Sequence, residues 1–260
     1  MTNVKRVKVG DIALDRITMD EVVDLAFENL SHQFSRALVI ETVNAQFVCL
    51  ARQKRQFSEL VSKADMVVAD GMSVVAASRL LGQPCPERVA GVDLLVRLCE
   101  KTAETGASVY FMGGKPGAAQ KTAERLIAQY PGLKIVGIDC PPMGFDKDPK
   151  QSARVIARIT SAAPDFLFVG LGAPKQEIWI DQYAETLPVK TMIGVGGSFE
   201  MLSGELPRAP KWMQQAGLEW LFRLGLEPGR LWKRYLLGNL HFMQIVAWQW
   251  MAQSTATTAS

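Results

Sequence analysis

An aspartate at the end of a short apolar run has the chemistry of a general base. Asp70 follows Met66–Ala69 and precedes Gly71. If the run is a strand, Asp70 lies at its carboxyl end, where partial burial would suit a carboxylate that takes a proton from an attacking hydroxyl. The same residues also fit an Asp-Gly turn or the N-cap of a helix that begins near Met72, and the pattern alone favours these structural roles.

Four other polar side chains occupy comparable positions. Thr42 and Asn44 follow the first long apolar run and offer a hydroxyl and an amide, although helix capping explains either residue alone better. Arg88 could bind a phosphate or sugar hydroxyls, or be an ordinary surface arginine. Gln176 opens a helix after Pro174, which suits either a sugar contact or a first-turn polar position.

Three glycine-rich segments complete the candidate chemistry. FMGGKPG, VGLGAPKQ and IGVGGSF contain Gly114, Gly172 and Gly196 and join apolar runs to helical segments. Backbone N–H groups at such helix starts can bind phosphate, so three on one edge favour a diphosphate ligand over glycines that merely permit tight turns. None of them is a GxGxxG or a GxxxxGK[ST] motif, so neither the dinucleotide nor the P-loop fingerprint is present.

A repeated strand-loop-helix pattern must position these residues. After a predicted hairpin at 7–17 and a helix at 18–30, whose Thr18 and Glu21 form a capping box, six apolar runs are each followed by a small-residue loop, and most loops lead into an amphipathic helix. This pattern predicts an α/β fold with a largely parallel, Rossmann-like sheet and helices on both faces. Ligands of such sheets bind beyond the carboxyl ends of the strands, where the candidate residues fall.

Composition narrows the possible chemistry. The 260 residues carry a formal charge of +3 and only two histidines, which lie far apart. A histidine-rich metal site or a Ser-His-Asp triad is therefore not expected, and a carboxylate is the expected base. We predict no metal and no cofactor, and nucleic acid is not an expected partner. The N-terminus has no apolar segment of the kind that marks a signal peptide.

The C-terminal part differs in character, and we predict a boundary near 204–210 between a catalytic core (1–206) and a helical appendage (207–260). Residues 207–240 contain six Lys or Arg against two acids, and five of the six tryptophans lie at or beyond Trp212. The uncharged stretch 235–252 is short and polar for a transmembrane helix. Amphipathic helices at a membrane surface fit better than a helix packed on the core or on a second copy of the chain.

Together these segments resemble the WecG/TagA/CpsF family of glycosyltransferases over roughly residues 39–239. The matching blocks occur in family order: ETVNAQ, ADGMSVV, ERVAGVDLL, YFMGGKPG, VGLGAPKQE, IGVGGSFEMLSGELPRAPKW and GLEWLFRLGLEPGRLWKRY. The resemblance implies an inverting enzyme that transfers a sugar from a UDP-sugar to a polyprenyl-diphosphate-linked saccharide in cell-surface polysaccharide synthesis. It also implies peripheral attachment to the cytoplasmic face of the membrane, without a metal.

The resemblance also implies roles for particular residues. Asp70 would be the general base and Thr42 its partner in the active site. Asn44, Arg88 and Gln176 would contact substrate, and Arg223 and Arg230 of the appendage would close over the donor diphosphate. Where a third basic residue is expected the chain has Lys233, which lacks the bidentate fork of arginine.

Two other functions compete with this one. A nicotinamide-dependent oxidoreductase would share the sheet, but it calls for a GxGxxG and a ribose-binding acid, neither of which occurs in good form. A non-catalytic scaffold that binds nucleotides at a membrane would leave Asp70 and the three glycine loops without a common purpose. The donor sugar, the acceptor sugar and whether the chain forms a homo-oligomer stay open.

Overall fold

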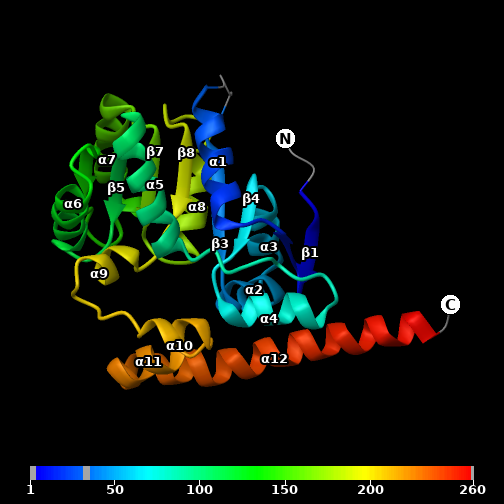
Figure 1. Ribbon diagram of the computed structural model, residues 1–260. Helices are drawn as coiled ribbons and strands as arrows, with labels where there is room; N and C mark the ends of the chain where they lie inside the picture. Colours follow the sequence, from blue (N-terminus) through cyan, green and yellow to red (C-terminus); the bar gives the residue numbers. More distant parts are fainter. Residues whose placement is uncertain (1–3, 32–35, 259–260) are drawn as a thin grey trace.

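A six-stranded parallel sheet forms the centre of the molecule in a computed structural model, which describes residues 4–31 and 36–258 and omits the side chains of 230, 233–235 and 256–258 (Figure 1). Its strand order is β4-β3-β8-β7-β5-β6, and every neighbouring pair is parallel. The strands are β3 (Leu38–Val43), β4 (Met66–Ala69), β5 (Ser108–Gly113), β6 (Lys134–Asp139), β7 (Phe166–Gly170) and β8 (Thr191–Gly194). The predicted parallel sheet is confirmed.

The central strands are mostly apolar because both faces of the sheet are covered there, whereas the edge strand β6 is only partly buried. β4, β7 and β8 are buried at every position, as expected for strands between two helical layers. One layer consists of α1 (Met19–Glu28), α5 (Gly91–Thr105), α6 (Ala118–Gln129) and α9 (Ser198–Leu202). The other consists of α2 (Ala45–Gln53), α3 (Arg55–Ser62), α4 (Met72–Leu80), α7 (Pro149–Ala162) and α8 (Lys175–Tyr183). Two short 3-10 turns, η1 (Asn29–Ser31) and η2 (Phe145–Lys147), complete the core.

The N-terminal predictions are also confirmed. β1 (Arg6–Val9) and β2 (Ile12–Asp15) pair as an antiparallel hairpin. Thr18 caps α1, because its hydroxyl accepts the Glu21 N–H while the Glu21 carboxylate accepts the Thr18 N–H at 2.8 Å. This reciprocal arrangement satisfies two N–H groups that a helix start otherwise leaves without partners.

The C-terminal residues 207–258, the appendage, are helical as predicted. They form α10 (Lys211–Gln215), α11 (Glu219–Leu226) and the long α12 (Pro228–Thr258), which runs beneath α2 and α4 (Figure 1). One face of α12 packs on the core, with Phe242 and Val246 buried. The Gln249 side chain also accepts from the Gly10 N–H at 2.8 Å and donates to the Lys8 carbonyl at 2.7 Å. Among the described residues, no helix combines the length and the apolar character needed to cross a membrane.

Candidate active site

A large cleft opens where the strands end, between the sheet edge and the appendage. Its volume is about 1840 Å³, above the roughly 300–1,000 Å³ usual for a small-molecule site. It is lined by nine of the ten predicted site residues: Thr42, Asn44, Asp70, Arg88, Gly114, Gly172, Gln176, Gly196 and Arg223. The tenth, Arg230, lies in α12, but its side chain is outside the part of the chain that the structure describes. The sheet and the appendage thus bring together residues that are up to 181 positions apart, from Thr42 to Arg223.

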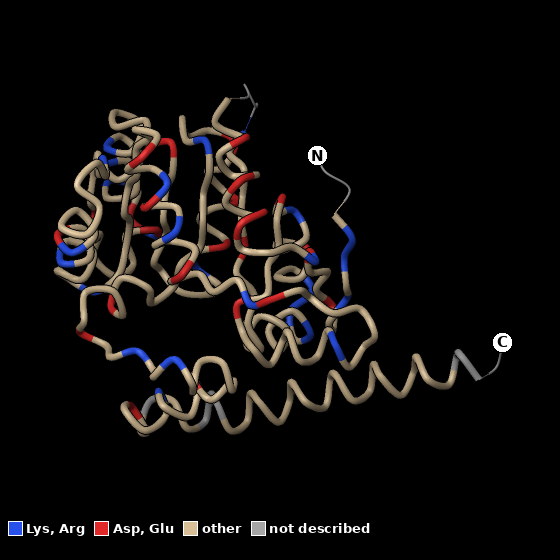
Figure 2. The backbone as a smooth tube through the Cα atoms, viewed as in Figure 1, with Lys and Arg blue, Asp and Glu red and all other residues tan. Residues whose placement is uncertain are grey.

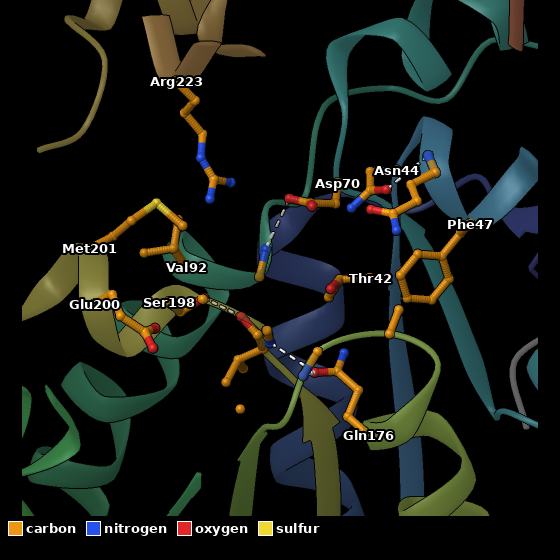
Figure 3. Close-up of a pocket in the computed structure, with 18 of the residues that line it drawn as sticks. Thr42, Asn44, Phe47, Asp70, Val92, Gln176, Ser198, Glu200, Met201 and Arg223 are labelled. Atoms are coloured by element: carbon orange, nitrogen blue, oxygen red, sulfur yellow. Dashed lines mark hydrogen bonds between the residues drawn. The ribbon is translucent and has the colours of Figure 1, made fainter. Parts of the chain in front are cut away.

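Asp70 occupies the carboxyl end of β4 and does not serve as a helix cap. Gly71 is the N-cap of α4, and no side chain bonds that helix start. The Asp70 Oδ1 instead accepts the N–H of Gly91, the first residue of α5, at 3.2 Å (Figure 3). A side chain at position 91 would begin 3.1 Å from the Thr42 hydroxyl, so glycine permits this close approach. The carboxylate therefore faces the cleft from a fixed position.

The pKa of the Asp70 carboxyl is raised from 3.8 to about 6. Burial is the largest cause, since it disfavours the charged form. The Arg88 guanidinium lowers the pKa, the Glu219 carboxylate raises it, and hydrogen bonds from the Gly91 N–H and the Asn44 side chain lower it. A carboxyl that titrates near pH 6 is ionised at neutral pH and still basic enough to take a proton, which is the property of a general base.

Asn44 and Thr42 support this arrangement from the neighbouring strand. Asn44 caps α2, with its side-chain oxygen accepting the Gln46 N–H at 3.0 Å, and its side chain also bonds Asp70. Asn44 therefore caps a helix and also lines the cleft. The buried Thr42 hydroxyl donates to the Gly194 carbonyl at 3.1 Å, which ties the end of β3 to the end of β8.

Gln176 joins two of the three glycine loops. Its Oε1 accepts the Gly172 N–H at 3.1 Å and the Gly196 N–H at 3.0 Å, and the residue is 3% exposed. The third loop is fixed separately, because the Gly114 N–H donates to the Gly170 carbonyl at 2.8 Å. These three N–H groups therefore already have partners within the protein, whereas binding of a diphosphate by the loops as a whole stays a prediction.

The two arginines that the structure describes differ in their environment. Arg88 donates to Glu219 at 2.9 Å and lies 3.4 Å from Asp93, so its charge is matched within the protein. Arg223 extends from α11 into the cleft on the side of Asp70 (Figure 3), and its buried Nε has no hydrogen-bond partner among the described residues. Arg223 is thus the better placed of the two to meet an anionic ligand.

The cleft also contains an acid that was not among the predicted site residues. Glu200, in the first turn of α9, lines the cleft and accepts the Lys115 N–H through Oε1 at 2.8 Å. Its Oε2 is buried without a partner among the described residues, which leaves an acceptor for a ligand hydroxyl. Its place directly after the glycine loop GGSF was the available signal. Among the same residues, no cluster of three or more His, Cys, Asp or Glu could hold a metal ion.

The match to a family of known proteins covers nearly the whole chain. The model of the Glycosyl transferase WecG/TagA/CpsF family matches residues 7–256. This chain belongs to the WecG/TagA/CpsF family of glycosyltransferases. The predicted resemblance is therefore confirmed, and an oxidoreductase or a non-catalytic scaffold is not favoured.

Two curated relatives illustrate the family. An N-acetylglucosaminyldiphosphoundecaprenol N-acetyl-beta-D-mannosaminyltransferase of Bacillus spizizenii strain W23 is 35% identical over 202 residues, which cover 78% of this chain and 76% of the relative. A protein of the same name from Staphylococcus aureus strain MRSA252 is 31% identical over 249 residues, 94% of this chain and 91% of the relative. The cleft of this WecG/TagA/CpsF glycosyltransferase is accordingly its candidate glycosyl-transfer site.

Proposed function

We propose that the chain transfers N-acetylmannosamine from its UDP derivative to an N-acetylglucosaminyl group carried on a polyprenyl diphosphate, with inversion at the anomeric carbon. The names of the relatives give the transferred sugar and the acceptor. The observation that carries the mechanism is the placement of Asp70. Asp70 lies at the strand edge, and burial raises the pKa of its carboxyl to about 6. The carboxylate faces a cleft large enough for two substrates.

In the proposed reaction the Asp70 carboxylate takes the proton of the acceptor hydroxyl. The hydroxyl oxygen bonds to C1 of the donor sugar as the bond between C1 and the UDP oxygen breaks on the opposite face. UDP leaves as an anion and needs no proton from the enzyme, so a single carboxylate suffices, unlike in glycoside hydrolysis. Asn44 and the Gly91 N–H would hold Asp70 in place, and Thr42 lies on the side of Gly91 where a side chain would otherwise be.

Side chains, rather than the three glycine amides, would hold the diphosphate. Arg223 extends into the cleft, and Lys115 and Lys175 also line it. Positive groups aimed at the leaving oxygen stabilise the charge that develops there. We assign Arg230 the same role by its match to the family. Glu200 would accept a hydrogen bond from a sugar hydroxyl, and Gly114, Gly172 and Gly196 shape the wall without a bulky side chain.

We further propose that residues 1–206 form the catalytic core and residues 207–260 attach it to the cytoplasmic face of the membrane. α12 also carries exposed apolar side chains that do not line the cleft. They are Trp232, Leu237, Trp248, Trp250 and Met251. Figure 2 shows α12 free of charged residues beyond its first turns. An apolar face beside a basic segment suits a helix that lies in a membrane interface, and a lipid-linked acceptor would be met there.

A reconstituted transfer assay tests this function. The enzyme is incubated with UDP-N-acetylmannosamine, its uronic acid analogue or UDP-glucose, and with a polyprenyl-diphosphate N-acetylglucosamine acceptor in vesicles. We expect a lipid-linked disaccharide with UDP-N-acetylmannosamine and release of one UDP for each disaccharide. Transfer from UDP-glucose alone would contradict the proposed donor, and no transfer from any UDP-sugar would contradict the function.

A further inference from the structure

The first residues of the appendage are fixed to the core by a bidentate ion pair. Arg208, the second residue of the appendage, donates from both terminal nitrogens to Asp93, each at 2.6 Å. Asp93 lies in the first turn of α5, the helix whose first N–H binds Asp70. Charge-assisted bidentate pairs of arginine and carboxylate are among the strongest and most directional polar contacts in proteins. The contact therefore sets an orientation as well as a distance.

A second tie lies beside the first and shares Asp93. Arg88 of the core donates to Glu219 of α11 at 2.9 Å and lies 3.4 Å from both Gln214 of α10 and Asp93. The Arg88 side chain is 15% exposed and that of Glu219 22%, so water screens this pair less than it screens a surface pair. Two core residues thus hold the appendage through two arginine–carboxylate pairs, one at Arg208 before α10 and one at Glu219 in α11.

The charges of this network, which we call the latch (Arg88, Asp93, Arg208 and Glu219), balance one another. Two guanidinium groups face two carboxylates, so Arg88 and Arg208 have little charge left for a ligand. Arg223 lies one helical turn after Glu219 on α11 and points into the cleft (Figure 3). Because residues four apart share a face of a helix, fixing Glu219 against Arg88 also fixes where Arg223 enters the cleft.

We infer that Asp93 and Arg208 are positioning residues. They hold the appendage in the position from which Arg223 reaches the donor diphosphate. Neither residue lines the cleft, and each acts through Arg223. This inference rests on the proposed function, which gives Arg223 its ligand. It adds that the core, through the first turn of α5, determines where the appendage places its arginine.

A double-mutant cycle between Asp93 and Arg223 tests the inference. We expect Asp93→Asn to lower kcat/KM about tenfold or more and Arg223→Ala to lower it at least as much, whereas the double variant should resemble Arg223→Ala alone. Strong coupling between residues with no hydrogen bond between them is the signature of one acting through the other. If the losses of kcat/KM in the two single variants multiply in the double variant, the two residues act independently and the inference is overturned.

Asp181→Asn is the matched control. Asp181 accepts two contacts from Lys63 at 3.0 and 2.9 Å and is 35% exposed, against 37% for Asp93, but its pair joins two helices of the core. We expect its kcat/KM to stay within about twofold of wild type. A loss equal to that of Asp93→Asn would overturn the inference, since any ion pair would then have the same effect.

Hydrogen–deuterium exchange gives a readout that does not depend on transferase activity. In Asp93→Asn and in Arg208→Gln, amides of 211–226 should exchange faster while those of β3 and β7 stay protected, which also shows that the core is folded. Unchanged exchange in 211–226 would overturn the latch even in an active enzyme. If wild type shows no transfer, the proposed function fails, whereas accelerated exchange confined to 211–226 would still support the latch.

Discussion

Acid should reduce sugar transfer through a single carboxyl group. The pKa of Asp70 is raised from 3.8 to about 6, chiefly by burial, and the proposed base works only when ionised. At about pH 5 a group with this pKa is roughly one-tenth ionised, whereas an ordinary aspartate would be about nine-tenths ionised. Above about pH 7 both would be almost fully ionised. We therefore expect kcat/KM to fall about tenfold between pH 8 and pH 5.

The assay is initial-rate transfer from a UDP-sugar to the lipid-linked acceptor across this pH range, with UDP binding measured by calorimetry at each pH. Asp70→Asn should bind UDP like wild type but lose turnover by about 10²–10⁴-fold. Asp181→Asn serves as the surface control and should keep the wild-type profile. A flat wild-type profile down to about pH 5, or near-normal turnover in Asp70→Asn, would refute the assignment of the base and the reasoning from its burial.

Three further outcomes are expected. Gln176→Leu removes the acceptor shared by two loop amides, so it should lower the free energy of unfolding by about 2 kcal/mol or more. Urea denaturation measures this loss, and turnover should fall with it. Unchanged stability would contradict the role of Gln176 in joining the loops. Burial raises the pKa of Glu177, so the folded state holds a proton that the unfolded state releases, and wild type should lose stability as the pH rises above the usual range of a glutamate, a loss that Glu177→Gln should reduce; an equal loss in the variant would contradict it. Replacing Trp248 and Met251 with serine should weaken sedimentation with anionic vesicles without loss of folding. The membrane face would be contradicted if the double variant sedimented like wild type and added salt did not weaken the sedimentation of wild type.

Local patterns account for what the sequence predicted well. The apolar runs that became β4 and β7 are continuous because both faces of the sheet are buried there, and this burial can be read from short segments. Position at a strand end is likewise local information, so Asp70 could be placed at the edge before its surroundings were known. Its burial and its bond to the Gly91 N–H depend on a helix that starts 21 residues later, and the pattern alone therefore favoured a turn or cap.

The parts of the site that the sequence did not reveal depend on contacts between distant segments. The amides of Gly172 and Gly196 looked free to bind phosphate, but they bond to Gln176, which the sequence suggested only as a substrate contact. Arg88 looked like a ligand for phosphate, yet Glu219, 131 residues away, matches its charge. No periodicity or motif indicates such a partner, because a long side chain can choose among several acids once the chain has folded.

The central claim, an inverting transfer assisted by one carboxylate, is tested most directly by the configuration of the product. The lipid-linked disaccharide made from an α-linked UDP-sugar can be purified and its anomeric proton and carbon measured by NMR, including the one-bond carbon–proton coupling. The proposed attack by an Asp70-activated hydroxyl on the face opposite UDP predicts a β-linked sugar. An α-linked product would contradict the account, because retention requires a second nucleophile or attack from the face that UDP leaves.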